Sequence, residues 1–152
     1  MKTIKLKSFS VVGISVRTTN EHMQAATDIL ALWNTFFAEN IGSKISNKTT
    51  EELYCVYTDY ETDFTKPYTT ILGYKVAHLN AIPEGLTGTT VPEKEYQVFT
   101  AKGKLAEGAV YNEWTKIWNT SIDRAYTADF EIYGERSQDP ENGEVDIYIA
   151  LK

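Results

Sequence analysis

The sequence predicts an α+β fold in which two β-α-β-β modules form a largely antiparallel sheet, with two helices on one face and a ligand cleft on the other. Two observations predict it. Strand-like and helix-like segments follow one another in the same order twice, and the two hairpins superpose with one offset, because Tyr57 plus 76 is Tyr133 and Ile71 plus 76 is Ile147. Duplication is the simplest explanation, so we expect a single domain over 1–152 with pseudo-repeats of approximately 1–80 and 81–152.

The first module begins with the β-rich segment Ser10–Val16. Asn20 then predicts a helix N-cap, since its side chain can accept a hydrogen bond from a free backbone N–H, and the helix is expected to end near Asn40. A hairpin of Leu53–Tyr60 and Tyr68–Ala77 follows, because both segments are rich in Tyr, Val, Thr and Ile. The helix carries apolar residues at helical spacing, which predict a stripe facing the core: Ala26, Ile29, Leu30, Trp33, Phe36 and Phe37.

The second module repeats this order. Tyr96–Ala101 is the first predicted strand, and the final hairpin pairs Asp129–Tyr133 with Val145–Leu151 across a loop of turn-forming residues at 138–143. Between them lies a second helical stripe, made of Val110, Tyr111, Trp114, Ile117 and Trp118.

Side chains alternate between the faces of a strand, so Phe130 and Ile132 point one way and Asp129, Glu131 and Tyr133 the other. We assign the apolar pair to the helices and the second set to the cleft. The cleft is thus predicted on the face away from the helices.

The offset makes Cys55 of the first module equivalent to Glu131 of the second, and Tyr57 equivalent to Tyr133. We expect Tyr57, Tyr133 and Glu131 near the centre of the cleft, with Tyr148 joining from the last strand and Cys55 as a small residue that makes room. The tryptophans lie on helical stripes, which favours the core for Trp33, Trp114 and Trp118, with one of them, taken as Trp114, contacting the ligand.

Composition excludes several classes of function. Fifteen Lys and Arg against 21 Asp and Glu give a net charge of −6, which predicts no direct binding to nucleic acid and no membrane partner. One cysteine and no apolar segment long enough for a membrane span favour the cytoplasm. His22, His78 and Cys55 match neither a metal-ligand pattern nor an activated thiolate, so no metal, cofactor or catalytic residue is predicted.

Five segments resemble the GyrI-like family, the effector-binding domains of AraC-type bacterial transcription activators. They are Leu53 to Tyr60 (LYCVYTDY), Tyr68 to Val76 (YTTILGYKV), Ile82 to Leu86 (IPEGL), Trp114 to Trp118 (WTKIW) and Asp129 to Tyr133 (DFEIY). The resemblance implies paired modules of the GyrI-like, SOUL-like type with a ligand cleft between them. It also implies a stand-alone member without the DNA-binding domain, similar to drug-binding proteins of integron cassettes, and it maps the family's cleft glutamate onto Glu131.

A carboxylate in an aromatic cleft is poorly hydrated, which raises its pKa and favours a cationic ligand. We therefore expect a non-enzymatic protein that binds amphipathic, cationic small molecules, with Glu131 as the counter-ion. Three alternatives stay open: Glu131 is a solvated residue or a partner of Arg124; the chain resembles hydrolases of cyclopropane natural products, with Glu131 as acid-base; or it acts on a protein partner, like the gyrase-inhibitory relatives.

Overall fold

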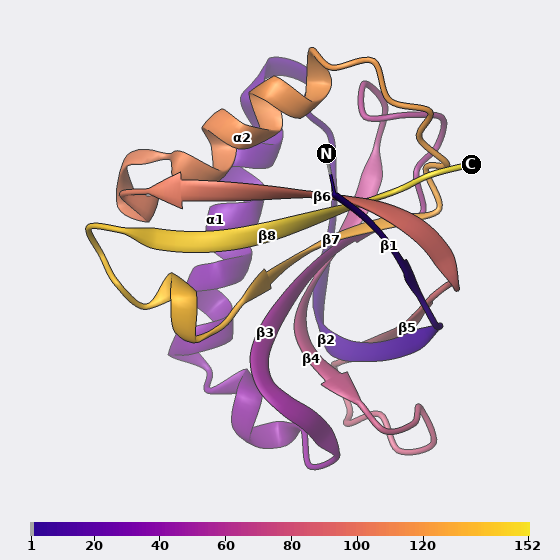
Figure 1. The fold of residues 1–152 in the computed structure, drawn as a ribbon. Helices are drawn as coiled ribbons and strands as arrows, with labels where there is room; N and C mark the ends of the chain where they lie inside the picture. The colour runs from indigo at the N-terminus through magenta and orange to yellow at the C-terminus, as the bar shows by residue number, and fades with distance from the viewer. Residues whose placement is uncertain (1) are drawn as a thin grey trace.

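The computed structural model describes residues 2–152, which form an eight-stranded antiparallel sheet and two α-helices (Figure 1). The predicted α+β class is confirmed. The strands are β1 (Lys2–Leu6), β2 (Phe9–Thr18), β3 (Lys48–Thr58), β4 (Tyr68–Val76), β5 (Thr87–Val91), β6 (Lys94–Gly103), β7 (Ala128–Tyr133) and β8 (Gly143–Ala150). The helices are α1 (Gln24–Ala38) and α2 (Ala109–Trp118), and the short 3-10 turns are η1 (Glu21–Met23), η2 (Ile41–Lys44), η3 (Leu105–Glu107) and η4 (Glu135–Ser137).

The strand order β1-β6-β8-β7-β3-β4-β2-β5 is pseudo-twofold about the central pair of β3 and β7. Exchanging the halves of the chain maps β1 onto β5, β2 onto β6, β3 onto β7 and β4 onto β8. Each half is therefore β-β-α-β-β, one strand longer than predicted. The additional strands are exchanged between the halves, because β1 pairs with β6 and β5 pairs with β2. Their sequences, KTIKL and TGTTV, carry too few apolar residues to indicate a buried strand.

The central ladder confirms one half of the predicted superposition and corrects the other. Cys55 pairs directly with Glu131 across β3 and β7, in agreement with the offset of Tyr57 and Tyr133. In the outer strands, however, Cys55 pairs with Leu72 while Glu131 pairs with Ile147, so Leu72 plus 75 is Ile147. Superposing Ile71 on Ile147 was wrong by one residue, which reverses the face to which a side chain points.

The two faces of the sheet are covered differently from the prediction. Phe130 and Ile132 do not meet the helices; they lie on the opposite face, in an aromatic core closed by the curl of the sheet itself. Tyr148 belongs to this core, where its ring stacks on Phe130 at 4.6 Å between centroids. Figure 1 shows both helices on one side of the sheet and the short strands β1 and β5 curling toward the other. An aromatic core occupies that side, whereas a cavity lies on the side of the helices, so the predicted position of the cleft is wrong.

Helix α1 also departs from the prediction at its start and on its core face. It begins at Gln24, after η1, and Asn20 makes no side-chain capping bond. The amide of Asn20 instead donates to the Phe64 carbonyl and accepts from the Tyr68 hydroxyl. Of the predicted stripe only Phe36 is fully buried, whereas Leu30 and Phe37 are 61% and 63% exposed.

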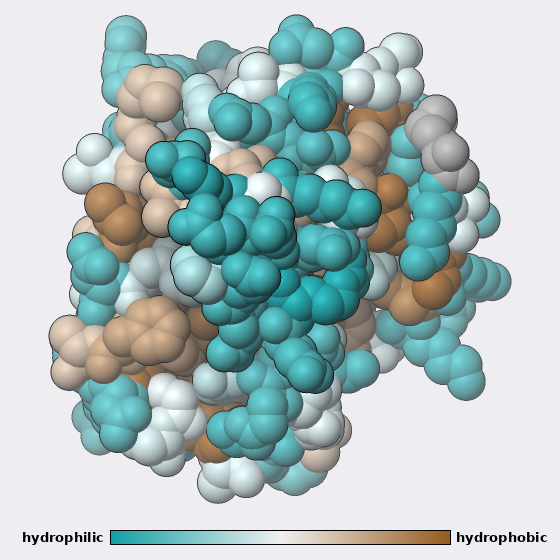
Figure 2. Space-filling model, turned by 60° about the vertical axis from the view of Figure 1, so that its left-hand side comes forward, coloured by the Kyte–Doolittle hydropathy of each residue, from teal (hydrophilic) through white to brown (hydrophobic). Residues whose placement is uncertain are grey.

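Each helix covers its own half of the sheet. Helix α1 packs on β2 and β4, and α2 packs on β6, so that the central strands β3 and β7 lie beneath the space between the helices. Turned so that the left-hand side of Figure 1 comes forward, the molecule presents mostly hydrophilic side chains, with hydrophobic ones in smaller separate patches (Figure 2). In the described part of the chain, neither helix is long and apolar enough to cross a membrane.

Candidate ligand-binding cavity

A cavity of about 580 Å³ opens between the two helices above the centre of the sheet. This volume lies within the range of roughly 300–1,000 Å³ that is usual for small-molecule sites. Helix α1 contributes Ala25, Ala26, Ile29, Leu30 and Trp33, and α2 contributes Val110, Tyr111, Trp114 and Trp118. The sheet and the loops contribute Asn20, Met23, Tyr57, Tyr60, Phe64, Tyr68, Gly108, Arg124, Glu131 and Tyr133. The apolar stripe of α1 that was expected to face the core thus largely lines a cavity.

Glu131 lies at the floor of the cavity, with only 1% of its surface exposed. Three neutral donors hold its carboxylate. Trp114 Nε1 and the Tyr57 hydroxyl donate to Oε2 at 2.5 and 2.8 Å, and the Tyr133 hydroxyl donates to Oε1 at 2.7 Å. Both oxygens are therefore fixed in position by groups that carry no charge.

Burial governs the ionisation of this cluster. It raises the pKa of Glu131, and the hydrogen bonds from Trp114, Tyr133 and Tyr57 oppose the rise without cancelling it. Burial also raises the pKa of Tyr57 and of Tyr133 well above the ordinary value, with a further rise from the nearby Glu131 carboxylate. The two hydroxyls consequently remain protonated and keep donating to Glu131.

No Lys or Arg among residues 2–152 forms an ion pair with Glu131. The interpretation of Arg124 as its partner is wrong, because Arg124 Nη2 donates to Asp129 Oδ2 at 2.7 Å. Asp129 lies two positions before Glu131 on β7 and is paired, whereas Glu131 has only neutral neighbours. Strand β7 therefore carries one compensated and one uncompensated buried carboxylate.

Aromatic rings form the walls around Glu131. Tyr57 packs edge-to-face on Trp114 at 5.4 Å between centroids, and Tyr133 packs edge-to-face on Trp33 at 4.7 Å. All three tryptophans line the cavity, and Trp33 and Trp118 also pack against the buried core, while Trp114 is buried and reaches Glu131. Helical periodicity marks a buried stripe without separating a core from a cavity wall.

The two remaining predicted site residues, Cys55 and Tyr148, lie on opposite faces of the sheet. Cys55 is fully buried beneath the cavity, and its thiol donates to the Tyr57 hydroxyl at 3.4 Å, so it supports the site from below. Burial raises the pKa of the Cys55 thiol, and the Glu131 carboxylate adds to the rise, which leaves an unreactive thiol. Tyr148 lies on the opposite face of the sheet, away from the cavity.

Several cavity residues were not predicted from the sequence. Tyr60 and Phe64 come from the β3–β4 connection, Met23 from η1, and Arg124 from the segment between α2 and β7. Loops approach a site through tertiary contacts, and hydrophobic periodicity carries no signal for them. Within the described residues there is no group of three or more His, Cys, Asp and Glu side chains that could hold a metal ion.

Comparison with known proteins agrees with this architecture. The chain is 31% identical to the integron cassette protein VCH_CASS2 from the mobile metagenome of Vibrio cholerae, with a TM-score of 0.77 over 99% of this chain and 95% of that one. It is 28% identical to YobU of Bacillus subtilis, named as a transcriptional regulator, over 98% of this chain and 94% of YobU. The fold of SAV2435, solved bound to tetraphenylphosphonium, matches with a TM-score of 0.82 at 18% identity, over 99% of this chain and 93% of that one.

The chain also matches a known protein family over nearly its whole length. The family described as Cass2, integron-associated effector binding protein, matches residues 3–151, which is nearly the whole chain. The resemblance of the five quoted segments to effector-binding domains is thereby confirmed. The chain belongs to the Cass2 family of integron-associated effector binding proteins.

Proposed function

We propose that the cavity binds amphipathic organic cations, and that Glu131 is their counter-ion. The observation that carries this proposal is a buried carboxylate held only by neutral donors inside an aromatic cavity. Burying such a charge without an opposite charge is unfavourable. A cation that enters the cavity compensates it and favours its ionised form.

The walls suit the remainder of such a ligand. Trp33, Tyr57, Trp114 and Tyr133 offer ring faces and edges around the carboxylate. A cation near an aromatic face gains about 0.5–2 kcal/mol, depending on how far it is desolvated, and the hydrocarbon of the ligand adds the hydrophobic effect. The tetraphenylphosphonium bound to SAV2435 is a ligand of this chemistry, which supports its use as a first probe.

The way in which Glu131 is held supports binding without turnover. Three hydrogen bonds fix its carboxylate as a static charge, and the tyrosine hydroxyls that donate to it keep their protons because burial raises their pKa. A group that transfers protons must reach the reacting atoms and change its hydrogen bonds. We infer that Glu131 serves recognition, as in an effector-binding protein, and that no chemical step takes place.

Titration with tetraphenylphosphonium, followed by the quenching of tryptophan fluorescence, tests the proposal directly because all three tryptophans line the cavity. We expect saturable binding by the unaltered protein. Glu131→Gln keeps the size of the side chain; its amide oxygen can accept from Trp114 and Tyr57, and its NH₂ can donate to the Tyr133 hydroxyl oxygen, so its expected loss of affinity of about a hundredfold or more reports the charge. Equal affinity in the two proteins would exclude Glu131 as the counter-ion.

A further inference from the structure

Large apolar side chains with much of their surface in water gather at the mouth of the cavity. Three of the cavity-lining residues are of this kind: Met23 is 56% exposed, Leu30 is 61% exposed and Tyr111 is 49% exposed. A single exposed hydrophobic residue is common on a protein surface, whereas a group of them beside a cavity marks a surface that binds an apolar partner.

These residues come from both helices. Met23 directly precedes α1 and Tyr111 lies in the first turn of α2, and the Tyr111 hydroxyl is 4.0 Å from Met23 Sδ. Leu30 follows Met23 by seven residues, or two helical turns, and therefore lies on the same side of α1 about 10 Å further along. Ala26, which also lines the cavity, lies between them. Met23, Ala26, Leu30 and Tyr111 together form an apolar rim.

Charge is confined to the interior of the cavity. Of the residues that line it, only Arg124 and Glu131 are charged, and they are 5% and 1% exposed. Arg124 forms an ion pair with Asp129, so Glu131 is the group that attracts a cation. The apolar rim offers no opposite charge, and a cationic group is stabilised only inside.

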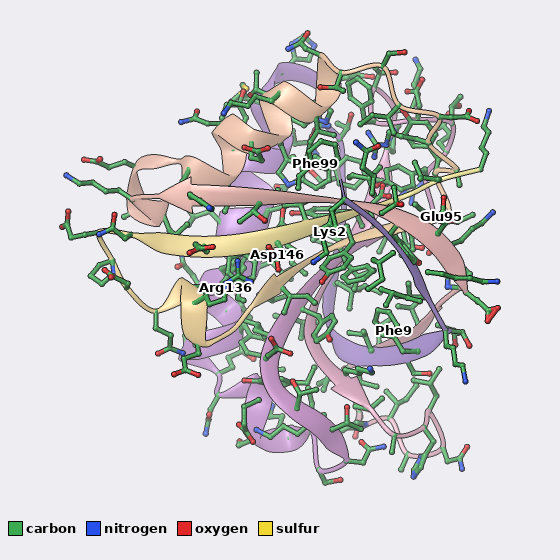
Figure 3. All side chains as sticks on the ribbon, in the orientation of Figure 1. Lys2, Phe9, Glu95, Phe99, Arg136 and Asp146 are labelled. Carbon is green, nitrogen blue, oxygen red and sulfur yellow. The ribbon has the colours of Figure 1, made fainter. Side chains whose placement is uncertain are left out.

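The aromatic core on the other face of the sheet is bordered by charged side chains instead. Asp146 lies two positions before Tyr148 on β8 and so on the same face. Arg136 donates to Asp146 at 2.9 Å and to Glu144 at 2.7 Å, and Figure 3 shows Arg136 beside Asp146. Such exposed ion pairs are well solvated without a ligand, whereas the apolar rim leaves water only when an apolar group covers it.

We infer that the ligand binds with its cationic group at Glu131 and an apolar tail on the apolar rim. This inference rests on the proposed function and specifies the class of ligand: single-tailed amphiphiles with a compact cationic head and a hydrocarbon tail that reaches out between the helices. Glu131 and the aromatic walls hold the head, and the apolar rim selects for the tail. The opposite orientation would leave the buried carboxylate without an opposite charge.

The test compares two probes that share one head, benzyltrimethylammonium and (4-octylbenzyl)trimethylammonium, both used below the concentration at which the octyl compound forms micelles. Each buried CH₂ group strengthens binding by about fourfold, so we expect the octyl compound to bind at least a hundredfold more tightly. Glu131→Gln should weaken both probes by a similar factor, because both place the head at the same site. A loss confined to the short probe would overturn the inference, since the octyl compound would then bind tail first.

Leu30→Gln and Tyr111→Gln make the apolar rim polar, one on each helix. We expect each variant to bind the octyl probe about five- to tenfold more weakly and to change the affinity for the short probe by less than twofold. The matched control is Phe37→Gln, because Phe37 also lies on α1 and is 63% exposed but does not line the cavity. The control should bind both probes as the unaltered protein does.

The outcomes separate this inference from the proposed function. Binding of the octyl probe that depends on Glu131 but is unchanged in both rim variants would overturn the inference and leave the proposed function intact. Equal losses for the two probes in the rim variants would also overturn it, because the apolar rim would then act on the head. Binding of neither probe to the unaltered protein would overturn the proposed function as well.

Discussion

Glu131 combines a raised pKa with a fixed position, and the pH dependence of binding follows from the two together. Burial raises the pKa above the ordinary value of 4.5. The cation binds the ionised carboxylate, so affinity is full above the raised pKa and falls as the pH drops through it. Below the raised pKa each pH unit lowers the association constant by about tenfold.

The measurement is the affinity for tetraphenylphosphonium as a function of pH, from neutral pH down toward 4.5. We expect the decline to begin above 4.5, because protonation of the buried carboxyl begins there. A neutral aromatic probe should show no such decline. An affinity for the cation that is constant down to pH 4.5 would contradict a raised pKa at the binding carboxylate.

Tyr57 has two separable contributions, one from its ring and one from its hydroxyl. Tyr57→Ala removes a cavity wall and should weaken cationic and neutral ligands alike. Tyr57→Phe keeps the ring and removes one hydrogen bond to Glu131, which should raise the pKa of Glu131 further and move the pH profile of cation binding upward. Titrations of both variants with tetraphenylphosphonium across pH measure the two contributions separately. An unchanged pH profile of binding in Tyr57→Phe would show that the hydroxyl does not affect the pKa of Glu131.

Among individual residues, the sequence placed Glu131, Tyr57 and Tyr133 together, as the structure does, because all three lie on the strands whose offset of 76 is exact in the ladder. Tyr148 failed for a specific reason. Subtracting the same offset gives Leu72, whose side chain does face the helices, but the equivalent of Leu72 is Ile147. One residue of slip exchanges the faces, and only the observed pairing reveals it.

Strands β2 and β4 approach each other closely where the sheet curls, and glycine is required on both. Gly13 pairs with Gly73, and a Cβ on Gly13 would lie 1.9 Å from the Leu72 carbonyl oxygen. The contact is with backbone, so neither side chain rotation nor a small shift relieves it. This close contact between β2 and β4 lies in the half of the sheet on which α1 packs.

Gly13→Ala is therefore expected to lower the free energy of unfolding by about 1–3 kcal/mol or more, measured by urea denaturation. Gly134→Ala is the matched control. There a Cβ would meet Glu52 Oε2 at 2.9 Å, at the end of a flexible exposed side chain that can move aside. Similar stabilities for the two variants would show that the strands can separate at Gly13 without loss.

At the level of elements, alternation along β7 correctly separated Glu131 from Phe130, yet it gave no indication of which set faces the helices. Both faces are buried, one by helices and one by the curl of the sheet. A pattern of period two reports that two faces differ and leaves their surroundings open. The strands β1 and β5, whose pairing closes the curl, were also invisible to apolar periodicity.

The whole molecule carries a net charge of −6, and acidic residues are concentrated in the two hairpin connections, at Asp59, Glu61 and Asp63 and at Asp139 and Glu141. Such a field attracts cations over a distance of about one Debye length, roughly 8 Å at physiological ionic strength. The field acts on the encounter, whereas the buried Glu131 acts in the complex.

Stopped-flow fluorescence at increasing NaCl concentration separates the two contributions. We expect the association rate constant of tetraphenylphosphonium to fall with salt while its dissociation rate constant changes little, because contacts inside the cavity are poorly screened. A neutral aromatic probe provides the comparison. An association rate that is independent of salt would show that the acidic surface plays no part in capture.

The central claim is that an uncompensated buried carboxylate selects cations, and an isosteric pair of probes tests it most directly. (4-Phenylbenzyl)trimethylammonium and 4-neopentylbiphenyl differ only in a charged nitrogen or a neutral carbon. The measurement is their ratio of affinities in the unaltered protein and in Glu131→Gln, with a thermal melt of each protein to establish folding. We predict a strong preference for the cation that disappears in the variant through loss of cation binding alone. The same preference in both proteins, or none in the unaltered one, would contradict the account.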